Sequence, residues 1–151
     1  MVFNPTLNHD FIPEFNQGSL HIETMEEMKL LGLIVSNDLT WKRNTEYLTK
    51  KAYQKLWSIK RLIKHGASLD DIIDIYEKQV RSVLEFGVPV WNSGITKEEA
   101  LEIERVQKSF LHIALGNSYK TYESALEITG LETLENRRLK LCEEGCKAPK
   151  T

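Results

Sequence analysis

The chain has 151 residues, of which 41% are hydrophobic and 28% charged, and its net charge is −2. This composition is typical of one globular domain that can bury a substantial core, and it excludes a largely disordered chain. No apolar run approaches the ~20 residues of a membrane helix, and the first residues lack the basic and apolar segments of a secretory signal. Cys142 and Cys146 are the only two cysteines and provide no disulfide framework, so we expect an intracellular protein, in the nucleus or the cytoplasm.

The charges are distributed unevenly along the chain. Residues 42–64 hold eight basic residues and one acidic residue, a balance of +7. The rest of the chain holds 12 basic and 21 acidic residues, a balance of −9. A surface polarised in this way attracts a polyanion at one place and repels it elsewhere.

The first 41 residues carry strand and turn patterns. Alternation of apolar and polar residues over 19–23 predicts a half-buried strand, and the leucine-rich and β-branched run 29–35 has the length of a strand. Gln17-Gly18 and Asn37-Asp38 supply turn chemistry. We therefore expect a small antiparallel sheet or hairpin in this part of the chain.

From Asn44 onward the pattern is helical. Asn44 or Thr45 is the predicted cap of a helix that extends to about Lys64. One narrow stripe of this helix is apolar and should face the core: Leu48, Ala52, Leu56, Ile59 and Ile63.

A second helix follows, with a Ser68-x-x-Asp71 cap, an apolar face that covers about half of its circumference, and a stop at Gly87. Such a wide apolar face is typical of the central helix of a bundle. It is formed by Leu69, Ile72, Ile73, Ile75, Tyr76, Val80, Val83 and Leu84.

Three further helices complete the predicted bundle. A capping box at 96–99 opens a long helix that ends at Gly116. A short helix is expected over 122–128, before Gly130, and a last one over 131–146, with Arg137, Arg138 and Lys140 pointing outward. The predicted fold class is mainly α (α+β), with a short N-terminal antiparallel hairpin or sheet followed by a bundle of four to five helices.

The helix that ends near Lys64 carries the clearest functional pattern. On a helical projection, four cations lie opposite the apolar stripe, with Tyr53 and Trp57 among them. The cations are Lys50, Lys60, Arg61 and Lys64. Because cations neutralise phosphates and aromatic rings stack on bases or sugars, this face is a candidate nucleic-acid site. The alternative is that the two rings pack beneath a neighbouring element and the lysines only solvate the face.

The sequence predicts no catalytic residue and no metal site. Asp70-Asp71 has the form of a polymerase carboxylate pair, but it follows Ser68 at a helix start, where acids favour the helix dipole. The four histidines are scattered, and Cys142 and Cys146 alone do not complete a set of zinc ligands. We expect no cofactor in this chain.

Five strings, taken in order, carry a family resemblance. They are Lys29–Val35 followed by Asn37–Trp41, Lys50–Ala52 with Leu56–Leu62, Tyr76 with Arg81–Trp91, Ile103–Lys108, and Leu131–Arg138. The third, for example, is similar to a Y-x-x-x-x-R-S-x-L-E-Y-G-x-x-V-W segment. Over nearly the whole chain, the order and spacing resemble the end of the palm and the thumb of non-LTR (LINE-like, jockey-like) retrotransposon reverse transcriptases.

The resemblance implies a division of the chain and a set of contacts. Residues 1–41 would be the end of the palm with a primer-grip-like hairpin, 42–146 the helical thumb and connection, and 147–151 a frayed tail. In the family these parts hold the primer end and lie along an RNA or DNA template–primer duplex. The implied nucleic-acid-binding residues are Leu30, Leu31, Gly32, Lys42, Arg43, Lys50, Tyr53, Trp57, Lys60, Arg61 and Lys64.

The resemblance also implies what is missing. In the family, the carboxylates that hold the magnesium ions lie in a Phe/Tyr-x-Asp-Asp turn that precedes the region similar to this chain. We therefore expect a truncated RNA-directed DNA polymerase, inactive alone, that grips duplex without sequence preference. Two alternatives remain. Without the palm, Leu30, Leu33 and Val35 would form an exposed apolar patch for a protein partner or for self-association, or the chain is a functionless pseudogene-like product.

Overall fold

The computed structural model describes the backbone of residues 16–17 and 20–21 and the whole of residues 25–147. Two antiparallel strand pairs come first: β1 (Asn16–Gln17) with β2 (Leu20–His21), and β3 (Glu27–Leu30) with β4 (Leu33–Ser36). The longer helices are α1 (Lys42–Lys64), α2 (Leu69–Ile75), α5 (Lys97–Leu115), α6 (Tyr122–Thr129) and α7 (Leu134–Gly145). Shorter turns of helix connect them: the π-helical η1 (Tyr76–Arg81), α3 (Ser82–Leu84), α4 (Val88–Trp91), η2 (Asn92–Gly94) and η3 (Gly116–Ser118).

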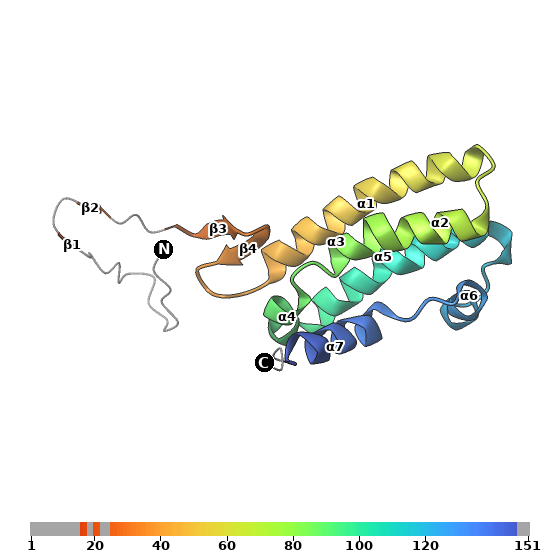
Figure 1. Cartoon of the computed structure of the whole chain (residues 1–151). Coiled ribbons are helices and arrows are strands. Elements are labelled where there is room, and N and C mark those ends of the chain that lie inside the picture. The colour runs from red at the N-terminus through yellow and green to blue at the C-terminus, as the bar shows by residue number, and fades with distance from the viewer. Residues whose placement is uncertain (1–15, 18–19, 22–24, 148–151) are drawn as a thin grey trace.

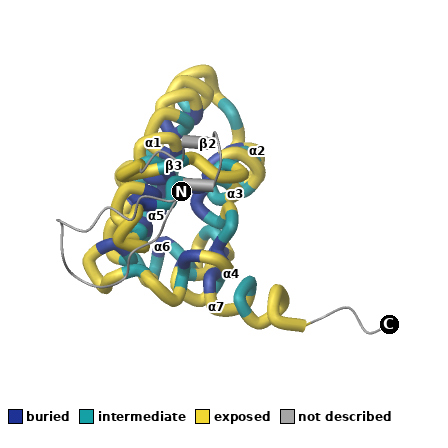
Figure 2. Tube along the Cα trace, turned by 90° about the vertical axis from the view of Figure 1, so that its left-hand side faces the viewer, coloured by how far each residue is buried: buried dark blue, intermediate teal, exposed yellow. Residues whose placement is uncertain are grey.

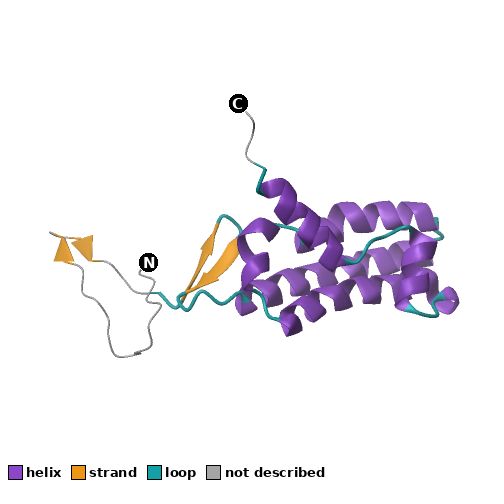
Figure 3. Ribbon diagram, turned by 90° about the horizontal axis from the view of Figure 1, so that it is seen from below, coloured by secondary structure: helices purple, strands orange, loops and turns teal. Residues whose placement is uncertain are grey.

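The fold is mainly α with a small β-hairpin, as the sequence predicts. The long helices lie side by side, and the β3–β4 hairpin lies at one end of them (Figures 1 and 3). Buried residues concentrate where the helices face one another, while the outer side of the bundle is exposed (Figure 2). The largest buried side chains are Trp91, Tyr76 and Phe110, and the Tyr76 and Phe110 rings stack with their centroids 3.9 Å apart.

The run 29–35 is bent back on itself rather than extended as one strand. Leu30 pairs with Leu33, so that Leu31 and Gly32 form a two-residue turn. Of the strand predicted over 19–23, only the two residues of β2 are described, and they pair with β1; residues 18–19 and 22–24 lie outside the description. The expectation that Leu33 belongs to an exposed patch is wrong: it is 8% exposed because its side chain lies against Gly87.

The start of α1 differs from the prediction. The helix begins at Lys42 after Trp41, and both predicted caps, Asn44 and Thr45, are buried within its first turn. The Asn44 Oδ1 accepts a hydrogen bond from the backbone N–H of Ile34 at 3.1 Å, so this amide ties the hairpin to the helix. The apolar stripe is confirmed: its first four residues are buried and Ile63 is half-buried.

The second predicted helix is a continuous rod made of α2, η1 and α3. It begins at the predicted cap, where the Ser68 Oγ accepts from the N–H of Asp71 at 3.2 Å. Its fully buried residues recur at every fourth position: Ile72, Tyr76, Val80 and Leu84. One α-helical turn holds 3.6 residues, so in a regular α-helix each fourth residue would be rotated slightly further around the axis and the row would leave one face. The wider π turn of η1 keeps the row facing α1 and, at Tyr76, also α5.

A buried amide joins the bundle's helices. The Tyr76 hydroxyl donates to Gln107 Oε1 at 2.8 Å, and Gln107 Nε2 donates to the Tyr122 hydroxyl at 3.0 Å and to the Glu132 carbonyl at 2.7 Å. These bonds connect α5 to η1, to α6 and to the segment before α7. Burial raises the pKa of Tyr76 well above its ordinary value, so its hydroxyl stays a donor.

Glu104 fixes the start of α7 from the neighbouring helix. Its carboxylate accepts from the backbone N–H groups of Leu134 at 3.1 Å and Glu135 at 3.2 Å, and from the Tyr122 hydroxyl. A carboxylate at this place satisfies free N–H groups and complements the helix dipole. α5 therefore positions α7 through side chains as well as through apolar packing.

Arg138 does not point outward as the sequence predicts. It is 4% exposed and donates from Nε to Asn92 Oδ1 at 3.0 Å, because it lies on the face of α7 that packs against α4 and α5. Arg137 is half-buried and makes a two-pronged ion pair with Glu85, at 2.8 and 3.0 Å. Lys140 is exposed, as predicted.

Replacing Gln107 by leucine should destabilise the bundle. Gln107→Leu leaves the buried Tyr76 hydroxyl and the Glu132 carbonyl without this partner, which costs roughly 1–3 kcal/mol per unsatisfied group. Urea unfolding measures the change in the free energy of unfolding. The matched control is Gln79→Leu at an exposed position of η1, where a change within about 0.5 kcal/mol is expected. Equal effects at the two positions would contradict the role given to Gln107.

Candidate nucleic-acid interface

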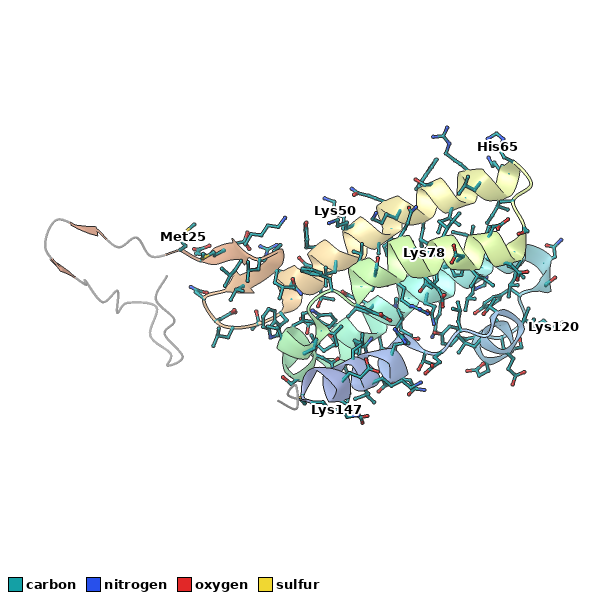
Figure 4. All side chains as sticks on the ribbon, viewed as in Figure 1. Met25, Lys50, His65, Lys78, Lys120 and Lys147 are labelled. Carbon is teal, nitrogen blue, oxygen red and sulfur yellow. The ribbon has the colours of Figure 1, made fainter. Side chains whose placement is uncertain are left out.

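The outer face of α1 gathers unpaired positive charge. Lys50, Lys60, Arg61 and Lys64 are all exposed, and none of them forms an ion pair with an acidic residue in the part of the chain that the structure describes. The inner stripe of the same helix packs on α5 and η1, which turns the cations to the outside. Lys50 points away from the bundle, and His65 lies at the far end of α1 (Figure 4).

Two aromatic rings lie on the same face. The side chain of Trp57 is 70% exposed and that of Tyr53 is 41% exposed. The alternative in which both rings pack beneath a neighbouring element is therefore wrong for Trp57. A solvent-exposed indole gives up the stabilisation that burial would provide. Its exposure beside cations therefore suggests a role in binding rather than in packing.

Lys42 and Arg43 have a different environment from the other predicted cations. The Arg43 guanidinium lies 3.7 Å from the Glu27 carboxylate and 3.5 Å from that of Glu46. Together with Lys42 it lines a shallow depression that also contains Glu26 and Asp38. Because four carboxylates surround these two cations, they do not extend the positive face of α1.

The tip of the hairpin is strained and exposed. Leu31 has φ 49° and Gly32 has φ 90°, the signs that a type I′ turn requires. A leucine in the left-handed region costs roughly 1–2 kcal/mol, yet this side chain is 89% exposed, so no burial offsets the cost. A Cβ on Gly32 would lie 2.9 Å from the ring of Phe86, so glycine permits the close approach of the turn to the end of α3.

The structure does not bring all the predicted site residues together. The hairpin tip lies against Phe86, whereas Lys60, Arg61 and Lys64 lie at the far end of α1 (Figure 1). A helix of 23 residues is about 34 Å long, so the tip and these cations are well separated. The predicted residues thus fall into three groups: the hairpin tip, the acid-surrounded pair, and the exposed face of Lys50, Tyr53, Trp57, Lys60, Arg61 and Lys64, which we call the α1 basic face.

Sequence reasoning missed a group beside this face. The Lys29 ammonium lies 3.0 Å from the Tyr47 hydroxyl and 4.8 Å from the ring centroid, and the Lys51 ammonium lies 5.7 Å from the same centroid. The hydrogen bond from Lys29 lowers the pKa of Tyr47 below its usual value. Lys51 follows Tyr47 by one helical turn, which is a signal visible in the sequence; the approach of Lys29 is a tertiary contact and is not.

No protein-family model, curated protein or solved structure matches this chain. Among the helices of the described residues, none has the length and apolarity needed to cross a membrane. Within the same residues, no three or more histidine, cysteine, aspartate or glutamate side chains gather where they could hold a metal ion.

Replacing Leu31 by asparagine should stabilise the chain. Asparagine tolerates the left-handed region and Asn-Gly is a preferred type I′ pair, so Leu31→Asn should raise the free energy of unfolding by up to about 1 kcal/mol. The control is Leu101→Asn, a 53% exposed helical position of α5, where a loss of about 0.5 kcal/mol or less is expected. Thermal or urea unfolding of both variants decides: equal losses would show that Leu31 is not strained.

Proposed function

We propose that this chain grips a template–primer duplex, RNA·DNA or DNA, without reading its sequence. It would do so as a thumb-like module related to non-LTR retrotransposon reverse transcriptases, and not as a polymerase by itself. The observation that carries the proposal is the 70% exposed indole of Trp57 among four cations that have no described acidic partner. Exposed cations beside an exposed ring are the elements of sequence-independent binding to a nucleic-acid backbone.

The geometry of the α1 basic face favours a backbone over base edges. Lys50 and Lys64 are separated by about 21 Å along the helix axis, at 1.5 Å per residue. Phosphates on a duplex strand rise about 3.4 Å per nucleotide along the axis and wind around it, so a straight row of this length can contact a few phosphates rather than one. In an A-form-like hybrid the minor groove is wide and shallow, which allows a convex helix to contact sugars and phosphates.

Contacts between the resembling strings support the family origin. Tyr76, from one string, is hydrogen-bonded to Gln107 from another, and Glu85 is paired with Arg137 from a third. Strings that belong to one scaffold are expected to contact one another in the folded chain. In the family, magnesium held by carboxylates of the palm performs the chemistry, and we assign no step of that chemistry to this chain.

Reversing the four cations should abolish most of the binding. The variant Lys50→Glu, Lys60→Glu, Arg61→Glu, Lys64→Glu should lose at least about tenfold in affinity at low salt. The slope of log affinity against log salt should also fall by about 0.9 for each phosphate that the variant no longer neutralises. Fluorescence anisotropy of a labelled RNA·DNA hybrid, repeated over a salt series and with a second unrelated sequence, measures both quantities.

The chain offers a control of identical composition and charge change. Lys97, Arg105, Lys120 and Lys147 are exposed, lie outside α1, and again comprise three lysines and one arginine. Their reversal to glutamate should weaken binding much less than reversal of the α1 basic face. If the two quadruple variants bind the hybrid alike, the face is not the interface. If affinities for two unrelated sequences differ widely, the binding is not sequence-independent.

A second candidate function is association through an apolar surface at the hairpin end. Leu30 is 51%, Leu31 89% and Phe86 48% exposed, and the turn packs directly on Phe86. An exposed cluster of large apolar residues is typical of a surface that binds another chain. In the family resemblance this end faces the palm, and a second copy of this chain could cover it instead.

Light scattering tests this second candidate. Self-association predicts a mass above that of a monomer at roughly tens of micromolar, which Leu31→Asp should reduce because it places a charge in the apolar contact. Leu101→Asp, at a 53% exposed position of α5, is the control and should leave the mass unchanged. A clean monomer at that concentration would rule out self-association through this surface.

A further inference from the structure

Three polar groups from two elements converge beside the α1 basic face. Lys29 extends from β3 and Lys51 from α1, and both ammonium groups approach the ring of Tyr47. The Tyr47 hydroxyl accepts from Lys29 at 3.0 Å. Lys29 and Lys51 are both exposed, so the group is open to a ligand from solvent.

The positive charges of Lys29 and Lys51 are not balanced by a nearby carboxylate among the described residues. Two ammonium groups on one ring repel each other. The depression lined by Glu26, Glu27 and Glu46 engages Arg43 instead. An anion with several acceptor oxygens would relieve the repulsion and accept hydrogen bonds from both lysines and from the phenol.

We propose that Lys29, Tyr47 and Lys51 form a phosphate-binding site that holds one backbone phosphate of the bound duplex and extends the grip from α1 onto the hairpin. This inference rests on the proposed function and adds a named site to it. The site would bind phosphate oxygens without regard to the base attached, since each of the three side chains would meet the ligand as a donor.

The site lies beside the hairpin end of the α1 basic face. Tyr47 precedes Lys50 by three residues, about 4.5 Å along the helix axis, and precedes Lys64 by 17 residues, about 26 Å. The site therefore lies near the hairpin end of the α1 basic face, with Tyr47 turned about 60° around the helix from Lys50 at 100° per residue. A duplex that lies along the face and reaches around its hairpin end toward β3 would also contact this site.

The test compares two double variants that remove the same charge. Lys29→Gln with Lys51→Gln should weaken binding of an RNA·DNA hybrid of about 12 base pairs roughly tenfold at low salt. The salt slope should fall by about 0.9, the amount expected for one phosphate. Lys120→Gln with Lys147→Gln is the control: both lysines lie on the side of the bundle away from α1 (Figure 4), and the slope should not change. Circular dichroism melts confirm that all variants are folded.

The single variants show whether the two lysines share one phosphate. If they do, their losses are not additive, because the second substitution removes a contact already weakened by the first. Tyr47→Phe keeps the ring and should lose a few-fold in affinity at most. A double variant that behaves like the control, while the α1 reversal still abolishes binding, overturns this site and leaves the proposed function intact. A wild-type chain that binds no hybrid at low salt overturns both.

Discussion

The side-chain amide of Gln107 is the contact on which the arrangement of the helices depends. A leucine at this position would fill the same interior but bind none of its three partners. The amide can accept from one tyrosine while donating to a second tyrosine and to a backbone carbonyl, and it thereby fixes three segments relative to α5. Buried polar groups of this kind favour one arrangement because every alternative leaves some of them unpaired. The orientation of α1, which packs against α5 and η1, follows from that arrangement.

The chain separates residues that build the scaffold from residues that meet solvent. Several of the side chains that carry the family resemblance, such as Tyr76, Trp91 and Gln107, are buried. The α1 basic face is formed by residues that no helix contact requires. Substitutions there can change binding without much change in stability, whereas changes in the scaffold act on every surface together. The proposed grip on a duplex therefore rests on exposed residues, whereas the proposed family origin rests on buried and exposed residues together.

Local rules predicted the parts of the fold that depend on local physics. The caps at Ser68 and Thr96, the end of the short helix at Gly130 and the buried stripe of α1 were all visible in the sequence. The failures share a different cause. The Asn44 side chain serves a strand that precedes it by ten residues, and Arg138 is buried by α4 and α5. The same reason hid the approach of Lys29 to Tyr47: which polar side chain meets which partner is decided by packing, not by spacing along one element.

The π turn of η1 has a consequence for how this chain tolerates changes in length. The buried row at every fourth residue fits a helix whose π turn contains one residue more than a regular α-helical turn. Gln79 lies within this π turn and is exposed. A chain without Gln79 would bring Tyr76 and Val80 three positions apart, which is regular α-helical spacing for one face. The extra residue is therefore removable without reversing which side chains face inward. A change in chain length, which is ordinarily tolerated only in loops, can therefore be accommodated at this position within a helix.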